Sequence, residues 1–181
     1  MHKLTALYLG IFSIFISFFS FLNIVYSYYF KFYLNLNSYI YTLIISLGIG
    51  IILIVLQNYK FDKKISLYDK LFIITFGFFY FPLLISLPYY FSIYKLSLLD
   101  SYFEAVSGFT STGFTIFNDI KSIDDSIVIW RSSSQWLGGL YYLFSLILLI
   151  EVFDIKVKNF LTSFISINLF EIRKQFFKIF L

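Results

Sequence analysis

The sequence predicts an all-α polytopic membrane protein, in which two N-terminal transmembrane helices precede one helix–pore loop–helix repeat. Hydrophobic residues make up 60% of the 181 residues and charged residues only 13%, whereas soluble domains carry about 25% charged residues. Four apolar stretches are each long enough to cross the hydrocarbon core, which takes about 20 helical residues. A polar, glycine-containing loop lies between the last two of these stretches.

The four apolar stretches define the predicted transmembrane helices. They run approximately over Leu4–Phe30, Tyr39–Leu56, Tyr68–Phe91 and Ser126–Ile150. The first is longer than the apolar part of a signal peptide and no small-residue cleavage site follows it, so we interpret it as a retained helix. The first two are expected to pair within residues 1–58, before a cytoplasmic connection over residues 59–67. Pro82 and Pro88 are expected to kink and end the third helix.

Basic residues are distributed unequally among the connections, which predicts the orientation. The connection from Gln57 to Lys70 carries four lysines, and residues 151–181 carry five basic residues. The segment from Ser92 to Asp125 carries two lysines against five acidic residues. Because cytoplasmic connections are enriched in lysine and arginine, we expect a multi-pass protein of the cell (inner) membrane with both termini in the cytoplasm.

An apolar stretch too short to cross a membrane lies in the outer segment. As a helix, Leu99–Phe109 would cover about 16 Å, roughly half of a bilayer core. Asp100 or Ser101 is expected to cap its N-terminus, with Glu104 in its first turns favoured by the helix dipole. We therefore predict a pore half-helix and filter at about residues 99–117, entering from outside and returning as extended chain. A surface helix in an extracellular loop is the alternative.

The loop after this half-helix has the composition of a cation filter built from backbone carbonyls. Thr110-Ser111-Thr112-Gly113-Phe114-Thr115 combines small hydroxyl side chains with a glycine. Glycine permits the dihedral angles that let successive carbonyl oxygens face one way, and such oxygens replace the hydration shell of potassium. Non-helical backbone at membrane depth must be buried in protein or reached by water. The loop therefore indicates transport.

Two motifs, one at the loop and one in the helix that follows, carry a family resemblance. The first is Phe103-Glu104-Ala105-Val106-Ser107-Gly108-Phe109-Thr110-Ser111-Thr112-Gly113, and the second is Trp130-Arg131 followed by Gln135-Trp136-Leu137-Gly138-Gly139. They resemble the first repeat of the Trk/Ktr potassium uptake transporters, specifically the TrkH-like membrane subunit. The resemblance implies one helix–pore loop–helix repeat over residues 68–150, and a potassium ion transporter rather than an enzyme.

The resemblance also implies a site and partners. The main-chain carbonyls of Ser111, Thr112 and Gly113 would form the potassium-binding filter, with K⁺ at Ser111 and Thr112, and Gly113 would also give the filter its bend. The ring of Phe114 would then point away from the pore. The implied partners are a cytoplasmic nucleotide-binding regulatory subunit, a second copy of the full-length transporter in a dimer, and membrane lipid. No nucleic acid and no cofactor other than the transported K⁺ are expected.

The number of repeats departs from the family pattern. Members of that family carry four repeats in one chain, whereas this sequence contains one. Residues 151–181 are expected to form a cytoplasmic tail and the start of a possible next repeat, because charges are again followed by an apolar run. We therefore expect a truncated portion of a transporter. The alternatives are a short channel-like subunit that forms homotetramers and a non-conducting membrane fragment.

Two ionisable residues and two glycines are expected to support the loop. Glu104 and Arg131 are placed at membrane depth, where an unpaired charge costs at least about 2.5–3.5 kcal/mol. We hypothesise that they bond one another or neighbouring backbone carbonyls and so brace the half-helix against the following helix; the alternative is that both stay solvated near the outer interface. Gly138 and Gly139 are expected to allow close helix approach.

Overall fold

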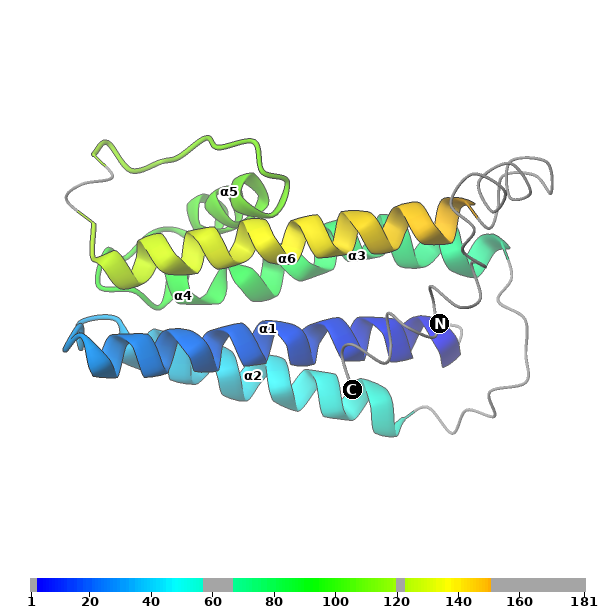
Figure 1. The fold of residues 1–181 in the computed structure, drawn as a ribbon, viewed down its shortest axis with the longest axis horizontal. Helices are drawn as coiled ribbons and strands as arrows, with labels where there is room; N and C mark the ends of the chain where they lie inside the picture. Colours follow the sequence, from blue (N-terminus) through cyan, green and yellow to red (C-terminus); the bar gives the residue numbers. More distant parts are fainter. Residues whose placement is uncertain (1–2, 57–66, 120–122, 151–181) are drawn as a thin grey trace, which may run out of the picture. The chain divides into compact units, whose positions relative to one another are not determined.

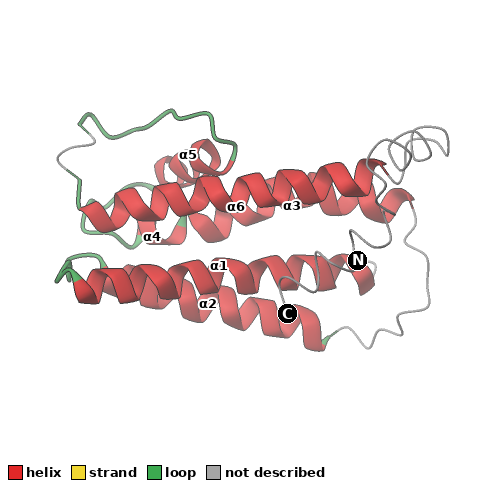
Figure 2. Cartoon of the chain, in the orientation of Figure 1, coloured by secondary structure: helices red, strands yellow, loops and turns green. Residues whose placement is uncertain are grey.

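Six α-helices follow one another in the computed structural model, which describes residues 3–56, 67–119 and 123–150 (Figure 1). Within these ranges only loops and turns connect the helices, and no strand is present (Figure 2). The chain divides into two compact units, Met1–Leu143 and Phe144–Leu181. Of the second unit only residues 144–150 are described, and they complete a helix that begins in the first unit.

The first two helices pair through their backbones. They are α1 (Lys3–Tyr29) and α2 (Leu36–Val55), joined by a short turn. A Cβ atom on Gly10 would lie 2.9 Å from the carbonyl oxygen of Gly50, so the two helices approach to backbone contact. The hydroxyl of Ser20 on α1 also donates to the carbonyl of Tyr39 on α2 at 2.7 Å. Such close packing of small residues is what stabilises helix pairs in lipid.

The third transmembrane stretch is interrupted where one helix was expected. It forms α3 (Leu67–Ile85) and the short α4 (Leu87–Tyr90), with the break at Ser86. Pro82 lies inside α3, and Pro88 lies in the first turn of α4, where its missing N–H needs no partner. The two prolines therefore flank the break.

The half-helix is α5 (Leu98–Phe109), followed by a loop and then by α6 (Asp125–Ile150). The expected cap at Asp100 or Ser101 is wrong, because the helix begins earlier and Ser97 is its N-cap. The Ser97 hydroxyl oxygen accepts from the Asp100 backbone N–H at 3.1 Å and donates to the Asp100 carboxylate at 2.7 Å. Asp100 thus lies at the third helical position, where its N–H is capped by Ser97 and its carboxylate holds the Ser97 hydroxyl in place.

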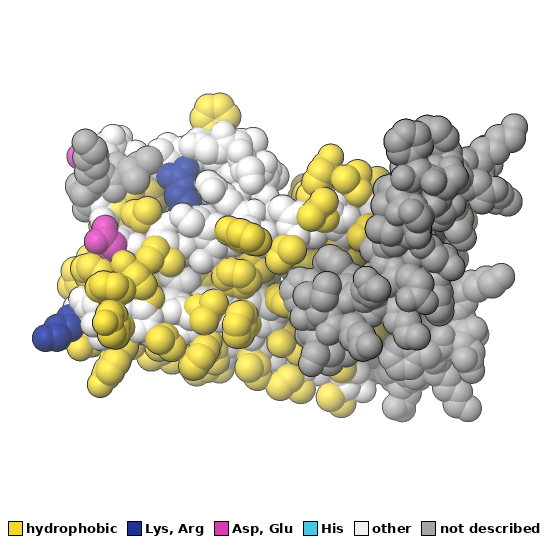
Figure 3. Space-filling model, viewed as in Figure 1, with side chains coloured by type: hydrophobic (Ala, Val, Ile, Leu, Met, Phe, Trp, Pro, Cys, Tyr) yellow, Lys and Arg dark blue, Asp and Glu magenta, His cyan; other side chains and the backbone are white. Residues whose placement is uncertain are grey.

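Among the residues that the structure describes, four helical segments are long and apolar enough to cross a membrane: Thr5–Tyr29, Leu36–Val55, Leu67–Tyr90 and Asp125–Ile150. Large apolar side chains are exposed along α1 and α2, among them Phe18, Phe21, Ile44 and Ile52. Figure 3 shows hydrophobic side chains spread over the face that it draws. Such a surface suits hydrocarbon rather than water. The predicted all-α polytopic membrane fold is confirmed.

Two predicted segments fall mainly outside the described residues. Of the cytoplasmic connection over residues 59–67, only Leu67 is described, and it begins α3. The predicted tail over residues 151–181 lies wholly outside them. Both segments therefore stay predictions.

Candidate ion-binding loop

Glycines let α5 and α6 pack at close range. A Cβ on Gly108 would collide with the Ser134 hydroxyl, and a Cβ on Gly138 would collide with the carbonyl of Phe109. These contacts fix the end of the half-helix against α6. Nothing lies within 4 Å of the place a Cβ would take on Gly139. In the described part of the chain the expected close approach is thus right for Gly138 and wrong for Gly139.

Aromatic rings support the end of the half-helix from α3 and α6. The Phe109 ring lies 5.7 Å from the Tyr141 ring and 6.3 Å from the Phe81 ring, measured between centroids. The Tyr141 hydroxyl donates to the carbonyl of Ile73 at 2.7 Å, which leaves the phenol with a partner in the apolar interior. A Cβ on Gly77 would collide with that hydroxyl. The loop that follows Phe109 therefore starts from a rigidly packed position.

The loop leaves the helix through a left-handed residue that is not glycine. Ser111 has φ 57°, and Gly113 has φ 83°. The Ser111 N–H donates to the Gly108 carbonyl at 3.0 Å, and the Thr112 N–H donates to the Ser107 carbonyl at 3.1 Å. These two bonds form a Schellman motif, in which the left-handed position usually belongs to glycine. The first bend of the loop thus falls at Ser111, and Gly113 gives a second one.

Arg131 of α6 holds the second half of the loop through hydrogen bonds to the loop's backbone. Its Nη2 donates to the carbonyl oxygens of Gly113 at 3.1 Å and Phe114 at 2.8 Å. The Ser107 hydroxyl also donates to the Phe114 carbonyl, at 2.6 Å. No donor among the described residues reaches the carbonyl oxygens of Ser111 and Thr112. The loop therefore presents two free carbonyls next to two that are already bound.

Glu104 is the buried centre of the contacts that hold the loop. Its side chain is fully buried, and its Oε1 lies 3.3 Å from Nε of Arg131. The Thr115 hydroxyl contacts both carboxylate oxygens at 3.1 Å, and the Ile116 N–H donates to Oε2 at 3.0 Å. A buried charge is costly unless it is paired and hydrogen-bonded, and here it is both. The structure thus brings Glu104 and Arg131 together behind the loop.

Exposure separates the loop from the groups that support it. Residues Thr110 to Phe114 are exposed, whereas Glu104 and Ser107 are buried. The Phe114 ring is 69% exposed, and its expected direction away from a pore stays a prediction. The sequence reasoning missed Ser107 and Thr115 as supports. Ser107 could have been found, because it lies three residues after Glu104 and hence on the same face of α5.

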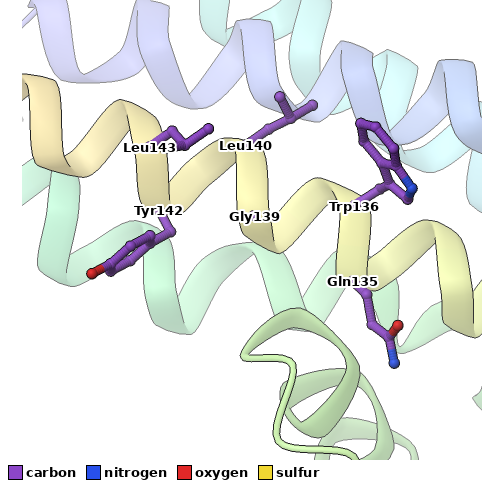
Figure 4. A pocket seen from close by; sticks show the side chains of 6 residues that line it. All are labelled: Gln135, Trp136, Gly139, Leu140, Tyr142 and Leu143. Atoms are coloured by element: carbon purple, nitrogen blue, oxygen red, sulfur yellow. The ribbon is translucent and has the colours of Figure 1, made fainter.

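An open hollow lies further along α6 and is unsuited to an ion. The residues that line it are Gln135, Trp136, Gly139, Leu140, Tyr142 and Leu143. Figure 4 shows Gln135 and Trp136 leaving the helix in different directions. The lining is mainly apolar and offers one amide group, so it lacks the convergent oxygens that a cation needs. The described residues also contain no group of three His, Cys, Asp or Glu side chains that could hold a metal.

The fold and the loop define an α-helical, multi-pass membrane protein with a half-helix and a polar loop between two spanning segments. Similar proteins of known name are transport proteins. The chain is 30% identical over 107 residues to an uncharacterized cation transporter of Methanocaldococcus jannaschii, a match over 59% of this chain and 23% of the relative. It is 44% identical over 55 residues to the Trk system potassium uptake protein TrkI of Halomonas elongata, covering 30% of this chain and 11% of that protein.

A third relative is the Trk system potassium uptake protein TrkH of Escherichia coli, 38% identical over 56 residues, or 30% of this chain and 12% of that protein. No family model and no solved structure matches. The predicted resemblance to the Trk potassium uptake proteins is thus confirmed over part of the chain, and these relatives are transporters rather than enzymes. The chain spans about a quarter of the length of the first of these relatives and about a tenth of the other two.

Proposed function

We propose that this chain forms one wall of a potassium uptake pathway, with the carbonyl oxygens of Ser111 and Thr112 as K⁺ ligands. The observation that carries the proposal is the pair of free carbonyls beside a loop segment fixed by Arg131 and Glu104. Fixed oxygens can replace the hydration shell of a cation. The similarity to Trk potassium uptake proteins supports potassium as the cation.

Gly113 takes a different part in this proposal from the one expected. Its positive φ shapes the loop, but its carbonyl oxygen accepts from Arg131 at 3.1 Å. In this conformation the Gly113 carbonyl is therefore engaged by a guanidinium group, and the two preceding carbonyls remain for the ion. Arg131 and Glu104 act as positioning residues.

One loop cannot enclose an ion. Potassium filters surround the ion with rings of carbonyl oxygens, and two oxygens from one loop form only part of such a ring. We propose that further loops of the same kind complete the site, as the four repeats implied by the resemblance would do in a longer transporter. Homotetramers of a short subunit would also supply four loops, and a non-conducting fragment would supply one.

The remaining parts of the proposal concern location and partners. We place the protein in the cell (inner) membrane with both termini in the cytoplasm, on the basis of the lysine and arginine distribution. A cytoplasmic nucleotide-binding regulatory subunit and a dimer of the complete transporter follow from the family resemblance. Co-purification of such a subunit with the tagged chain would test the first partner.

Rubidium uptake tests the proposed function in cells that lack their own potassium uptake systems. The cells express either the full chain or a chimera in which residues 1–150 replace the corresponding portion of the Escherichia coli TrkH relative. We expect uptake by the chimera, and its loss in Gly113→Ala, because alanine is strained at φ 83°. Gly139→Ala is the matched control, since its Cβ meets nothing within 4 Å.

The comparison between the two proteins separates the alternatives. Rubidium uptake in cells that express only the full chain, with the same loss of uptake in Gly113→Ala, would favour the homotetramer. Uptake by neither, with membrane insertion confirmed for both, would overturn the proposal in favour of a non-conducting fragment. Equal effects of the two glycine substitutions would show that the loop is not the ion pathway.

A further inference from the structure

A second polar network lies apart from the ion-binding loop, at the turn between α1 and α2. Asn35 is only 1% exposed. Its Nδ2 donates to the Asp124 carboxylate at 2.8 Å, and its Oδ1 accepts from the Ile93 N–H at 3.1 Å. Ile93 lies before α5 and Asp124 lies just before α6. Asn35, from the N-terminal helix pair, thus binds both ends of the segment that carries the loop, which runs from Ile93 to Asp124.

Asn35 makes these contacts instead of the one its position would predict. It is the N-cap residue of α2, where an asparagine side chain normally accepts from the first turn of its own helix. Here the side chain makes no capping hydrogen bond. Both ends of its amide are used by the distant segment, with donor facing acceptor in each case. The geometry therefore favours a role in holding that segment over a role in starting α2.

Asp124 joins the same network from the other side. Its carboxylate accepts from the Ser126 hydroxyl at 3.0 Å, and its backbone N–H donates to the Tyr94 hydroxyl at 2.7 Å. The Tyr39 hydroxyl of α2 donates to the Ser126 hydroxyl oxygen at 3.1 Å. The two ends of the loop-bearing segment are therefore linked directly by the bond between Asp124 and Tyr94, and a second time through the Tyr39 side chain of α2.

We propose that Asn35 is a positioning residue for ion binding. It clamps the two ends of the loop-bearing segment, Ile93 and Asp124, and thereby holds the free carbonyls of Ser111 and Thr112 in place. Closing a long segment costs conformational entropy, and ion ligands need positions fixed to within a fraction of an ångström. The Asn35 clamp restricts the position of the segment at its two ends, while Arg131 restricts it at the loop. The part of this inference that concerns ions rests on the proposed function.

Exchanging the two side chains tests the clamp. Asn35→Asp places a carboxylate against the Asp124 carboxylate, whereas Asp124→Asn keeps an amide oxygen that accepts from the Asn35 amide. The double variant Asn35→Asp/Asp124→Asn restores a donor–acceptor match, since the new carboxylate accepts from both the amide introduced at position 124 and the Ile93 N–H. Asn37→Asp is the matched control, because Asn37 is exposed at the same end of α2.

Hydrogen exchange of the full chain in lipid nanodiscs gives a readout that does not depend on transport. Asn35→Asp should speed exchange of the Ile93 amide roughly tenfold, because repulsion from the Asp124 carboxylate moves the acceptor at position 35 away from the Ile93 N–H and that hydrogen bond is lost. The double variant should return the rate to within about twofold of wild type, and Asn37→Asp should leave it unchanged. An unchanged rate in Asn35→Asp, or no recovery in the double variant, would overturn the clamp.

Rubidium uptake by the chimera that carries residues 1–150 tests the positioning role. We expect Asn35→Asp to raise the KM for rubidium severalfold and the double variant to restore it, at equal protein levels. Faster exchange with an unchanged KM would reduce the clamp to a structural contact and overturn the positioning role. If the wild-type chimera takes up no rubidium, the proposed function fails, and hydrogen exchange alone decides whether the clamp exists.

Discussion

At the scale of single residues, the loop depends on side chains that bind backbone rather than ligand. Arg131 and Ser107 bind carbonyl oxygens, and Glu104 binds a backbone N–H together with a hydroxyl. The carbonyls of Ser111 and Thr112 accept from no donor among the described residues. The chemistry of the loop is thus set by which carbonyls are already hydrogen-bonded. Substitution of a supporting side chain should leave one specific backbone carbonyl or N–H without its hydrogen-bond partner.

Removal of Arg131 should cost more than removal of its partner. Arg131→Gln leaves the fully buried Glu104 without a cation, and we expect a loss of about 3–5 kcal/mol in stability. Glu104→Gln keeps acceptors for Thr115 and Ile116, so its loss should be smaller. Chemical unfolding of the full chain in detergent measures both, and the double variant should be more stable than Arg131→Gln alone. Unchanged protein level and uptake in Arg131→Gln would end the brace hypothesis.

Ser111 should carry measurable backbone strain. Its φ of 57° is left-handed, which costs an L-residue about 1–2 kcal/mol, whereas glycine adopts it freely. We expect Ser111→Gly to raise stability by about 0.5–1 kcal/mol, after the extra entropy of glycine in the unfolded chain is subtracted. Thermal unfolding in detergent measures the change. Ser132→Gly, at an exposed position inside α6, should change stability in the opposite direction.

At the scale of helices, the sequence predicted most of what the structure shows. The apolar stretches placed the spanning helices to within a few residues, and the short stretch at Leu99–Phe109 placed α5 to within one. Long apolar runs are strong signals because the bilayer sets their length. The two prolines predicted a distortion in this stretch but not its place at Ser86. The cap at Ser97 was missed, because it depends on local hydrogen bonds that several neighbouring residues could have made.

The contacts between helices were the least predictable part. Arg131 was expected to bond Glu104 or neighbouring backbone carbonyls, and it bonds both, but the sequence did not tell which carbonyls it reaches, those of Gly113 and Phe114. Each residue along a helix turns the next side chain by about 100°, so the reach of one side chain depends on how two helices are rotated against each other. A single sequence indicates how two helices are rotated against each other only where a glycine permits close approach, as at Gly138.

The contact between α5 and α6 should be intolerant of one extra carbon. Gly138→Ala would press a Cβ into the Phe109 carbonyl, and overpacking of this kind costs about 1–3 kcal/mol. Gly139→Ala, on the open side of the same helix, should be neutral or slightly stabilising. Parallel unfolding curves of the two variants in detergent test this. Equal losses would mean that helix flexibility, rather than the contact with α5, requires glycine here.

At the scale of the whole molecule, the distribution of charge and the polar network at Asn35 set one orientation. The turn between α1 and α2 and the loop-bearing segment should lie outside, and the Gln57–Lys70 connection should lie inside. The chain has no cysteine, so single cysteines report position without background.

Thiol labelling of intact spheroplasts tests this orientation. Tyr33 is 55% exposed in the α1–α2 turn, and Leu56 is 75% exposed at the other end of α2. A membrane-impermeant maleimide should label Tyr33→Cys from outside, because the distribution of lysine and arginine predicts that this turn faces away from the cytoplasm. Labelling of Leu56→Cys should require permeabilised cells. The reverse pattern would invert the topology and move the loop to the cytoplasmic side.

The buried carboxylate of Glu104 also dictates an order of events during biosynthesis. Its charged partner lies in a helix that leaves the ribosome later. Until α6 enters the bilayer, α5 carries an unpaired acid that hydrocarbon disfavours by several kcal/mol. The half-helix should therefore wait near the outer headgroups and settle to its final depth only when α6 brings its arginine alongside. The loop should therefore acquire its shape only after α6 has entered the membrane.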